Sequence, residues 1–366
     1  MPEHIPSFSR PEPPVVGPAS DERKKELQQE LAQNFENNRA QVPENGRLRL
    51  SLVEYPKQEY EKRIIADANR LLNDMLIDAG VKPFDISEDN IYIVPDKTFR
   101  EISPSPENWT SSGISLNRHQ TIILNAEELG NPLSRAAVIL HEMTHLKNFN
   151  SFEAPDEESS WFRRSGLGMQ STRQRDETIG GDFHRFYGLN EAVVSEVEKR
   201  LFQRLVEDNP VLKEEQASLL ASEGYIEKRK EIAKRKSFDE NDIIYINDDE
   251  REIARFNYGN QRKVLDYIID TIYRKHPDQF ASEEDVFNLF LQAHFGGQLL
   301  PLARAIKSTF GEDAFRVLGM MSGSDTNSVR NVMDYFQKKG GRIKKEASSE
   351  PVDHAETTES PQDLTQ

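Results

Sequence analysis

The spacing of hydrophobic residues along the chain predicts both helices and strands. Over residues 57–79, large apolar residues recur every three or four positions, which is typical of an amphipathic helix, and Gly80 follows as its end. Short apolar runs over residues 91–94, 114–116 and 121–124 predict three strands. The last two strands are separated by a polar turn, so we expect them to form a hairpin.

Helical spacing dominates the rest of the chain. Asn131-Pro132 is a typical helix start. The Asn side chain can cap the first turn, and the N–H that Pro lacks has no hydrogen-bond partner within a helix at this position. A helix over residues 132–148 and another over 189–206 follow, and residues 243–246 predict a short strand or buried turn. Further helices are expected over residues 262–273, 283–293, 300–310, 313–320 and 328–336. The pattern indicates an α+β protein, with a small mixed sheet and an active-site helix followed by a mostly helical C-terminal half.

Polar, Pro-rich stretches at both ends predict the domain boundaries. We expect disordered tails over residues 1–45 and 339–366, although a polar helix from Asp21, capped by Ser20, is compatible with the first of them. The folded domain then spans residues 46–338. Within it we expect a sheet-containing half over 46–150, a mobile polar interval over 153–181 and a helical half over 182–338.

Composition narrows the classes of function. The net charge of −16 argues against nucleic acid as a partner, because phosphate binding needs clustered Lys and Arg. No apolar stretch has the length that crosses a bilayer, and no basic segment followed by an apolar run marks the N-terminus. With no cysteine, a disulfide framework and a thiolate metal site are excluded. We therefore expect a cytoplasmic protein without a membrane partner; oligomeric state is not predicted.

One motif carries the chemistry: His141-Glu142-Met143-Thr144-His145, which lies inside the helix predicted over residues 132–148. Residues four apart on a helix share a face, so His141 and His145 can direct both imidazoles at one Zn²⁺ ion. Glu142 beside them could take a proton from a metal-bound water. Histidine is scarce, with 8 in 366 residues, so a chance match is uncommon.

A catalytic zinc site normally has three protein ligands and one open position, so a third ligand is needed. A third histidine shortly after the pair is absent, since Asn148 and Ser151 occupy the corresponding positions. Glu191 in Asn190-Glu191-Ala192 is the favoured ligand, because Asn190 could cap the helix that Glu191 opens. His184 is the competing candidate, either as a ligand or as a hydrogen-bond donor.

Together, His141-Glu142-Met143-Thr144-His145 and Asn190-Glu191-Ala192 resemble the gluzincin branch of the zincin metallopeptidases, which have the thermolysin-like arrangement. The chain also resembles a loose group of uncharacterised bacterial zincin-like proteins. The resemblance covers roughly residues 85–200. It implies that His141, His145 and Glu191 bind one Zn²⁺ ion and that Glu142 is the general base of peptide hydrolysis.

The chain departs from this family pattern at three places. Relatives commonly place an acid four residues after the ligand glutamate, where it orients a ligand histidine, whereas Ser195 stands there in this chain. Glu196 and Glu198 follow close by, so the support of the ligands is left open. Lys147 replaces an apolar flanking residue, and the polar interval over residues 153–181 is long and charged.

Other residues are assigned from their context. For the donor that shares negative charge on the substrate oxygen we favour Tyr258, which precedes a predicted helix, over His184. The resemblance to zincins also implies that the segment 113–124 pairs with an extended substrate through its backbone. His119 is expected at the surface, and His276 and His294 are expected to be structural.

We therefore expect a zinc metallopeptidase that acts on a peptide or protein. Zinc lowers the pKa of its bound water, Glu142 accepts a proton as the water attacks the scissile carbonyl, and the proton passes to the leaving amine. The alternative is a zincin-like metal-binding regulatory or interaction module with little turnover. Two observations support this alternative: Ser195 stands where an acid is expected, and the polar interval is long.

Overall fold

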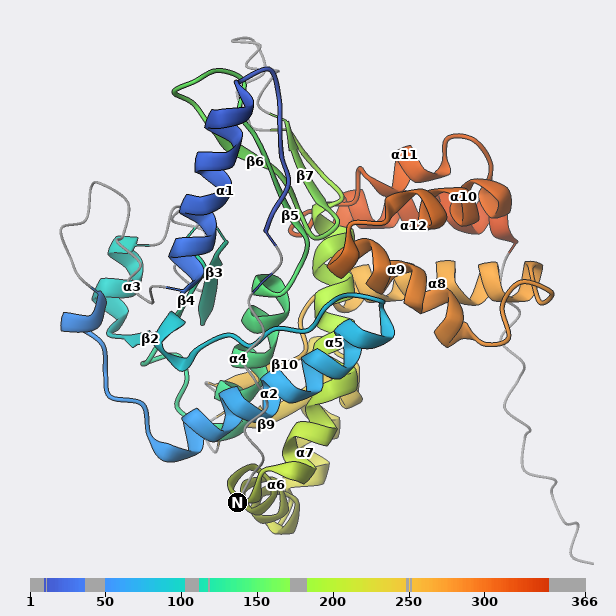
Figure 1. Ribbon diagram of the computed structural model, residues 1–366. Helices are drawn as coiled ribbons and strands as arrows, with labels where there is room; N and C mark the ends of the chain where they lie inside the picture. The colour runs from blue at the N-terminus through green and yellow to red at the C-terminus, as the bar shows by residue number, and fades with distance from the viewer. Residues whose placement is uncertain are drawn as a thin grey trace, which may run out of the picture.

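Three small sheets and a larger set of helices make up the computed structural model (Figure 1), which confirms the predicted α+β class. A three-stranded sheet and a five-stranded sheet lie on one side of the central helices, and the C-terminal helices lie on the other. The structure describes Arg10 and residues 12–36, 50–102, 112–117, 119–171, 183–247, 250 and 252–341.

The three-stranded sheet contains the strands predicted ahead of the active-site helix. Strands β2 (Ile91–Val94), β3 (Gly113–Leu116) and β4 (Thr121–Asn125) have the order β2-β4-β3. β3 and β4 form the predicted antiparallel hairpin, whereas β2 runs parallel to β4, so the sheet is mixed as expected. β3 lies at the edge of this sheet. A short 3-10 helix, Leu50–Leu52, and helix α3 (Asp96–Ile102) flank it.

Three helices form the main core. They are α2 (Glu59–Asp78), α4 (Pro132–Leu146) and α5 (Tyr187–Asp208), each close to its predicted bounds. One of them, α4, packs directly against β3 and β4. The start of α4 is the predicted one, since the Asn131 side chain accepts a hydrogen bond from the backbone N–H of Leu133 at 2.8 Å. Apolar residues of α4 and α5 bury against each other, and this contact fixes the two helices that carry the candidate ligands.

A second sheet occupies parts of the chain that we predicted to be polar and mobile. Its strands are β1 (Val15–Val16), β5 (Asn150–Glu153), β6 (Trp161–Ser165), β7 (Gly168–Ser171) and β8 (Phe183–Arg185), in that order. β6 and β7 lie within the interval over residues 153–181 that we predicted to be mobile and polar. Antiparallel backbone bonds to β5 and β8 hold these strands despite their weak hydrophobic pattern.

The predicted N-terminal tail also contains regular structure. β1 pairs in parallel with β5, and helix α1 (Asp21–Glu36) follows at the position suggested by Ser20 and Asp21. The prediction of a disordered segment thus fails for residues 12–36, because backbone bonds to β5 and burial of Leu27 against Ala154 outweigh the polar composition. Residues 1–9, 11 and 37–49, also predicted as tail, lie outside the described residues.

The C-terminal half is mainly helical, as predicted, but a short hairpin interrupts it. Strands β9 (Ile243–Ile246) and β10 (Ile253–Arg255) pair with each other in an antiparallel ladder. The helices are α6 (Pro210–Ala221), α7 (Tyr225–Lys236), α8 (Gly259–Lys275), α9 (Glu283–Gly296), α10 (Leu299–Phe310), α11 (Ala314–Leu318) and α12 (Thr326–Gly340). None of the helices in the described ranges combines the length and apolar character that crossing a bilayer needs. Most of the predicted C-terminal tail, residues 342–366, lies outside the description.

Candidate metal centre

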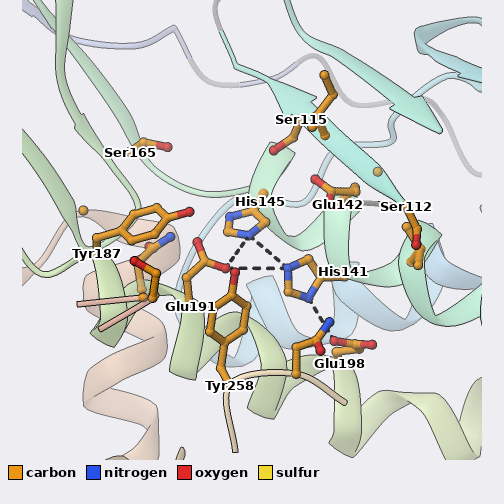
Figure 2. Close-up of a pocket in the computed structure, with 18 of the residues that line it drawn as sticks. Ser112, Ser115, His141, Glu142, His145, Ser165, Tyr187, Glu191, Glu198 and Tyr258 are labelled. Atoms are coloured by element: carbon orange, nitrogen blue, oxygen red, sulfur yellow. Dashed lines mark hydrogen bonds and ion pairs between the residues drawn. The ribbon is translucent and has the colours of Figure 1, made fainter. Parts of the chain in front are cut away.

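The structure brings together the three side chains that the sequence suggested as metal ligands. His141 and His145 project from one face of α4, and Glu191 projects toward them from the first turns of α5 (Figure 2). The Nε2 atoms of His141 and His145 are 3.2 Å apart. Glu191 Oε2 lies 3.7 Å from His141 Nε2 and 3.3 Å from His145 Nε2. One atom from each residue therefore faces a common point.

These separations fit a tetrahedral metal site. Zn²⁺ binds imidazole nitrogens and carboxylate oxygens at about 2.0–2.2 Å, so adjacent corners of its tetrahedron are about 3.3 Å apart. The three measured separations, 3.2, 3.3 and 3.7 Å, are close to that spacing. The donor set of two imidazoles and one carboxylate is also the one found in zinc sites of hydrolases. The residues present thus fit a Zn²⁺ ion with one corner left for solvent or substrate.

The electrostatic environment favours a cation at this point. Burial alone would lower the pKa of His141, but hydrogen bonds to Glu191 and Glu198 outweigh it and raise that pKa well above its ordinary value. Burial would raise the pKa of Glu191, but the charges and hydrogen bonds of His145 and His141 lower it far below its ordinary range. A divalent cation would supply the positive charge that stabilises these ionised carboxylates.

Glu198 supplies the support that the sequence left unassigned. It lies on α5 two turns after Glu191, and its Oε2 is 2.9 Å from His141 Nδ1, opposite the nitrogen that faces the site. A carboxylate that accepts the Nδ1–H bond fixes the tautomer in which Nε2 is free to bind a metal. Glu198 is 4% exposed, so this bond is shielded from water. Glu198 therefore takes the orienting role for which we expected an acid at the position of Ser195.

Ser195 contributes differently, by holding the turn that carries Tyr258. Its buried hydroxyl donates a hydrogen bond to the carbonyl of Asn257 at 2.8 Å. Arg262 Nε donates to the same carbonyl at 3.3 Å. The turn at the start of α8 is thus attached to α5, the helix that provides Glu191.

Glu142 lies beside the three candidate ligands on the side of the cleft bordered by β3 (Figure 2). The Glu142 side chain has room because Gly113 of β3 has no side chain. A Cβ at Gly113 would approach Val138 Cγ1 to 2.7 Å and Glu142 Cγ to 3.0 Å. Glu142 is 8% exposed but lines the cleft, a position suited to exchanging a proton with a molecule bound there.

Two tyrosines border the site opposite Glu142, and the sequence indicated only Tyr258. The Tyr258 ring stacks on the His141 ring with centroids 6.3 Å apart, and Tyr258 lies close enough to Glu191 for the carboxylate charge to raise its pKa. Tyr187, four residues before Glu191 on α5, lines the cleft beside Tyr258. Burial and the Glu191 charge raise the pKa of Tyr258, and chiefly the Glu191 charge raises that of Tyr187. Both hydroxyls therefore keep their protons and act as donors.

Both tyrosines depend on left-handed backbone at a helix start. Tyr258 itself has φ 56°, and Phe186, which immediately precedes Tyr187, has φ 60°. Non-glycine residues rarely adopt this conformation because of steric repulsion, so surrounding contacts must hold it. The N–H of Phe186 donates to the carbonyl of Gly319, and the Tyr187 ring lies against Gly323, where a Cβ would come within 2.5 Å of the ring.

The remaining sequence candidates lie elsewhere or beyond the description. The backbone of His184 belongs to β8, but its side chain lies outside the described part, so its role is not decided. His119, which we expected at the surface, is half-buried and lines the cleft. His276 Nε2 is 3.0 Å from Thr309 Oγ1, and His294 is fully buried with its pKa lowered to about 3 by burial. Both surroundings agree with structural roles.

Lys147, the unusual flanking residue, is also buried. Its Nζ donates to Asn73 Oδ1 at 2.6 Å and to the carbonyl of Phe84. Burial lowers its pKa to about 7. It connects the end of α4 to α2 and to the segment before β2, away from the candidate ligands.

A cleft of about 1640 Å³ opens over the candidate ligands. Its walls come from β3, from the hairpin β9–β10, from β6 and β7, and from the segment between α11 and α12. A cleft of this size exceeds what a single amino acid needs and is suited to a larger molecule.

Comparisons of this chain with models of known protein families, with curated proteins and with solved structures give no match.

Proposed function

We propose that this protein is a zinc-dependent metallopeptidase of the zincin type, which hydrolyses peptide bonds with Glu142 as general base. The observation that carries the proposal is the convergence of His141, His145 and Glu191 from two helices to within 4.8 Å of one another, at the floor of a large cleft. Glu142 and a hydroxyl donor adjoin the same point, and this combination of groups is what hydrolysis of an amide requires.

Each residue has a chemical role in this proposal. His141, His145 and Glu191 would hold Zn²⁺, which would polarise the scissile carbonyl and lower the pKa of water toward neutrality. Glu142 accepts a proton from the attacking water and transfers it to the leaving amine. Tyr258 donates a hydrogen bond to the carbonyl oxygen as negative charge develops on it. Glu198 keeps His141 in the tautomer that leaves Nε2 unprotonated.

The decisive experiment is the Glu142→Gln variant. This substitution keeps the shape of the side chain but removes its basicity, so hydrolysis should fall by roughly 10² to 10⁴-fold while zinc stoichiometry stays near one. Cleavage of labelled casein and metal analysis of the same samples measure the two quantities. Glu158→Gln, at an exposed position away from the cleft, is the matched control.

The alternative of a metal-binding module without turnover predicts a different result. Wild-type protein would then bind zinc with a stoichiometry near one and cleave no member of a broad peptide library. One argument for this alternative was that Ser195 cannot orient a histidine, and it is weaker because Glu198 contacts His141.

Undiminished cleavage by Glu142→Gln would show that Glu142 is not the general base.

A further inference from the structure

Tyr258 has a carbonyl on each side of its Cα held by one residue, Arg262. The backbone N–H of Arg262 donates to the carbonyl of Tyr258 at 2.9 Å, and the side-chain Nε of Arg262 donates to the carbonyl of Asn257 at 3.3 Å. Tyr258 has a left-handed φ of 56°, which a tyrosine adopts only where surrounding contacts hold it. Rotation about φ or ψ of Tyr258 would turn these two carbonyls relative to each other. The two bonds therefore hold the conformation that directs the ring toward the candidate ligands (Figure 2).

The guanidinium of Arg262 is itself fixed by Asp242. Arg262 Nη2 donates to Asp242 Oδ2, and Lys199 Nζ of α5 donates to Asp242 Oδ1 at 2.7 Å. Arg262 and Asp242 are each 5% exposed, so water competes little for this ion pair. A planar guanidinium presents its N–H donors in a rigid arrangement, so one side chain serves Asp242 and Asn257 together. A lysine has a single ammonium and no second nitrogen to place at the other acceptor.

Asp242 connects this arrangement to the hairpin of β9 and β10. Asp242 directly precedes β9, and its carbonyl accepts the N–H of Phe256, which directly follows β10, at 2.8 Å. Backbone groups of three consecutive residues are thus held. Asp242 holds Phe256, Arg262 together with Ser195 holds Asn257, and Arg262 holds Tyr258. The chain that leads from the hairpin to Tyr258 therefore depends on the pair of Asp242 and Arg262.

Stability alone does not account for a buried ion pair at this place. Removing two charges from water costs free energy that apolar side chains of similar size would not require, so such pairs contribute little net stability. Their geometry is specific, however, because each charge has to meet its partner. Arg262 Nη1 also lies 3.9 Å from Glu196 Oε2 of α5, the helix that carries Glu191. The guanidinium thus lies between the hairpin and the helix that supplies a candidate ligand.

We propose that Arg262, fixed by Asp242, is a positioning residue that sets the place of the Tyr258 hydroxyl relative to the candidate metal ligands. This inference rests on the proposed function, in which Tyr258 donates to the carbonyl oxygen of the substrate. Arg262 is not among the residues that line the cleft, whereas Asn257 and Tyr258 are. Arg262 therefore acts through Tyr258 and not by contact with a substrate.

A double-mutant cycle between Arg262 and Tyr258 tests this route of action. Arg262→Lys keeps the charge but loses the rigid set of donors, so kcat should fall by about tenfold, with KM and zinc affinity within about threefold of wild type. In the Tyr258→Phe protein the same substitution should lower kcat by less than about twofold, because the hydroxyl that Arg262 positions is already absent. A residue needed only for the stability of the fold would lower kcat equally in both backgrounds.

Arg229→Lys is the matched control for this substitution. Arg229 of α7 pairs with Glu240 at 3.0 Å and does not line the cleft. The exchange of arginine for lysine there should leave kcat within about twofold in both backgrounds, because partly exposed ion pairs contribute little.

The position of Tyr258 can also be measured without turnover. Fluorotyrosine is placed at position 258 of the Glu142→Gln protein, and its fluorine NMR resonance is recorded before and after addition of Co²⁺, a paramagnetic ion with the same kinds of ligand as zinc. The ring stacks on His141, so its resonance should shift when Co²⁺ binds. Arg262→Lys should move the resonance of the metal-free protein and change the shift that Co²⁺ causes, whereas Arg229→Lys should leave both as they are in the parent.

A second variant keeps the test decisive if Arg262→Lys does not fold. Asp242→Asn combined with Arg262→Met removes both buried charges, so neither is left without its partner. Methionine has no N–H to donate to the carbonyl of Asn257. This variant should show a loss of kcat of about tenfold or more and a moved fluorine resonance.

Two outcomes would overturn the inference. A loss of kcat of the same size with and without the Tyr258 hydroxyl would mean that Arg262 does not act through it. An unmoved fluorine resonance in both folded variants would mean that Tyr258 keeps its place without the guanidinium. Absence of cleavage by wild-type protein would instead contradict the proposed function, and the fluorine resonance would then still decide whether Arg262 positions Tyr258.

Discussion

The floor and the walls of the cleft are built in different ways. On the floor, His141, His145 and Glu191 project from two helices with ordinary backbone, and Glu198 behind them is buried. The walls consist of strand edges and of two helix starts with left-handed residues, Phe186 and Tyr258. Core packing thus determines the positions of the candidate metal ligands, whereas local backbone conformation determines the positions of the groups that would contact the proposed substrate. The two properties should therefore respond separately to substitution.

The largest expected effect comes from breaking the floor. Glu191→Ala removes one of three candidate ligands and leaves two imidazoles, so zinc affinity should fall by more than about 100-fold, beyond the loss that a supporting residue causes. Competition with a chromogenic chelator measures it. His184→Ala is the control, because it distinguishes the two candidate third ligands. Wild-type affinity in Glu191→Ala together with a loss in His184→Ala would reverse our assignment.

A wall residue should affect turnover and spare the metal. Tyr258→Phe keeps the ring stacked on His141 but deletes the donor, so kcat should fall by about 100-fold with zinc affinity unchanged. Tyr187→Phe removes the hydroxyl that lines the cleft beside Tyr258 and should lower kcat by less than about tenfold. Steady-state kinetics on one peptide measures both. An equal loss in the two variants would mean that the hydroxyls act as one unit.

The next effect concerns the buried support of the floor. Glu198→Gln exchanges the carboxylate that accepts the His141 Nδ1–H bond for a weaker acceptor, so zinc affinity should fall by about 10 to 100-fold. Glu207→Gln, an exposed position on the same helix, should leave zinc affinity unchanged. If the two variants bind zinc equally well, orientation of His141 does not depend on Glu198.

The smallest effect is expected where floor and wall are joined. Ser195→Ala removes one of the two donors to the Asn257 carbonyl, and Arg262 retains the other. The free energy of unfolding should fall by about 1 kcal/mol. Tyr258 follows Asn257 in the sequence, so loss of this bond should shift its hydroxyl slightly. We therefore expect a small decrease in kcat and no change in zinc affinity. Urea unfolding and kinetics measure these quantities, and Ser195→Thr, which restores a hydroxyl, should recover part of kcat.

The helices of the floor could be predicted because their signals are local. Apolar spacing and the Asn131-Pro132 start determine α4, and the spacing of His141 and His145 follows from the helical repeat. Glu198 also had a signal, since it lies two turns from Glu191 on the same face. That signal did not identify which of the nearby acids reaches a histidine, because the answer depends on how α4 and α5 pack.

The walls could not be predicted in the same way. Tyr187 was missed because α5 starts two residues earlier than its apolar pattern, at a left-handed phenylalanine that sequence rules disfavour. β5, Asn150–Glu153, alternates too weakly to predict a strand, and its partners in β1 and β6 are distant in sequence or polar. Such strands are determined by backbone pairing, which leaves little trace in residue type.

The connection between Arg10 and α4 has a practical consequence for how this protein can be shortened. The Arg10 guanidinium donates to the carbonyl of Asn148 at 3.0 Å, three residues after His145, and β1 continues along the strand that follows. A version beginning after residue 20 would lack this bond and β1, and would therefore lose one of the contacts that hold the end of the helix bearing both histidines. If His141 and His145 bind zinc as proposed, preparations that differ only at their leading residues should therefore differ in zinc affinity.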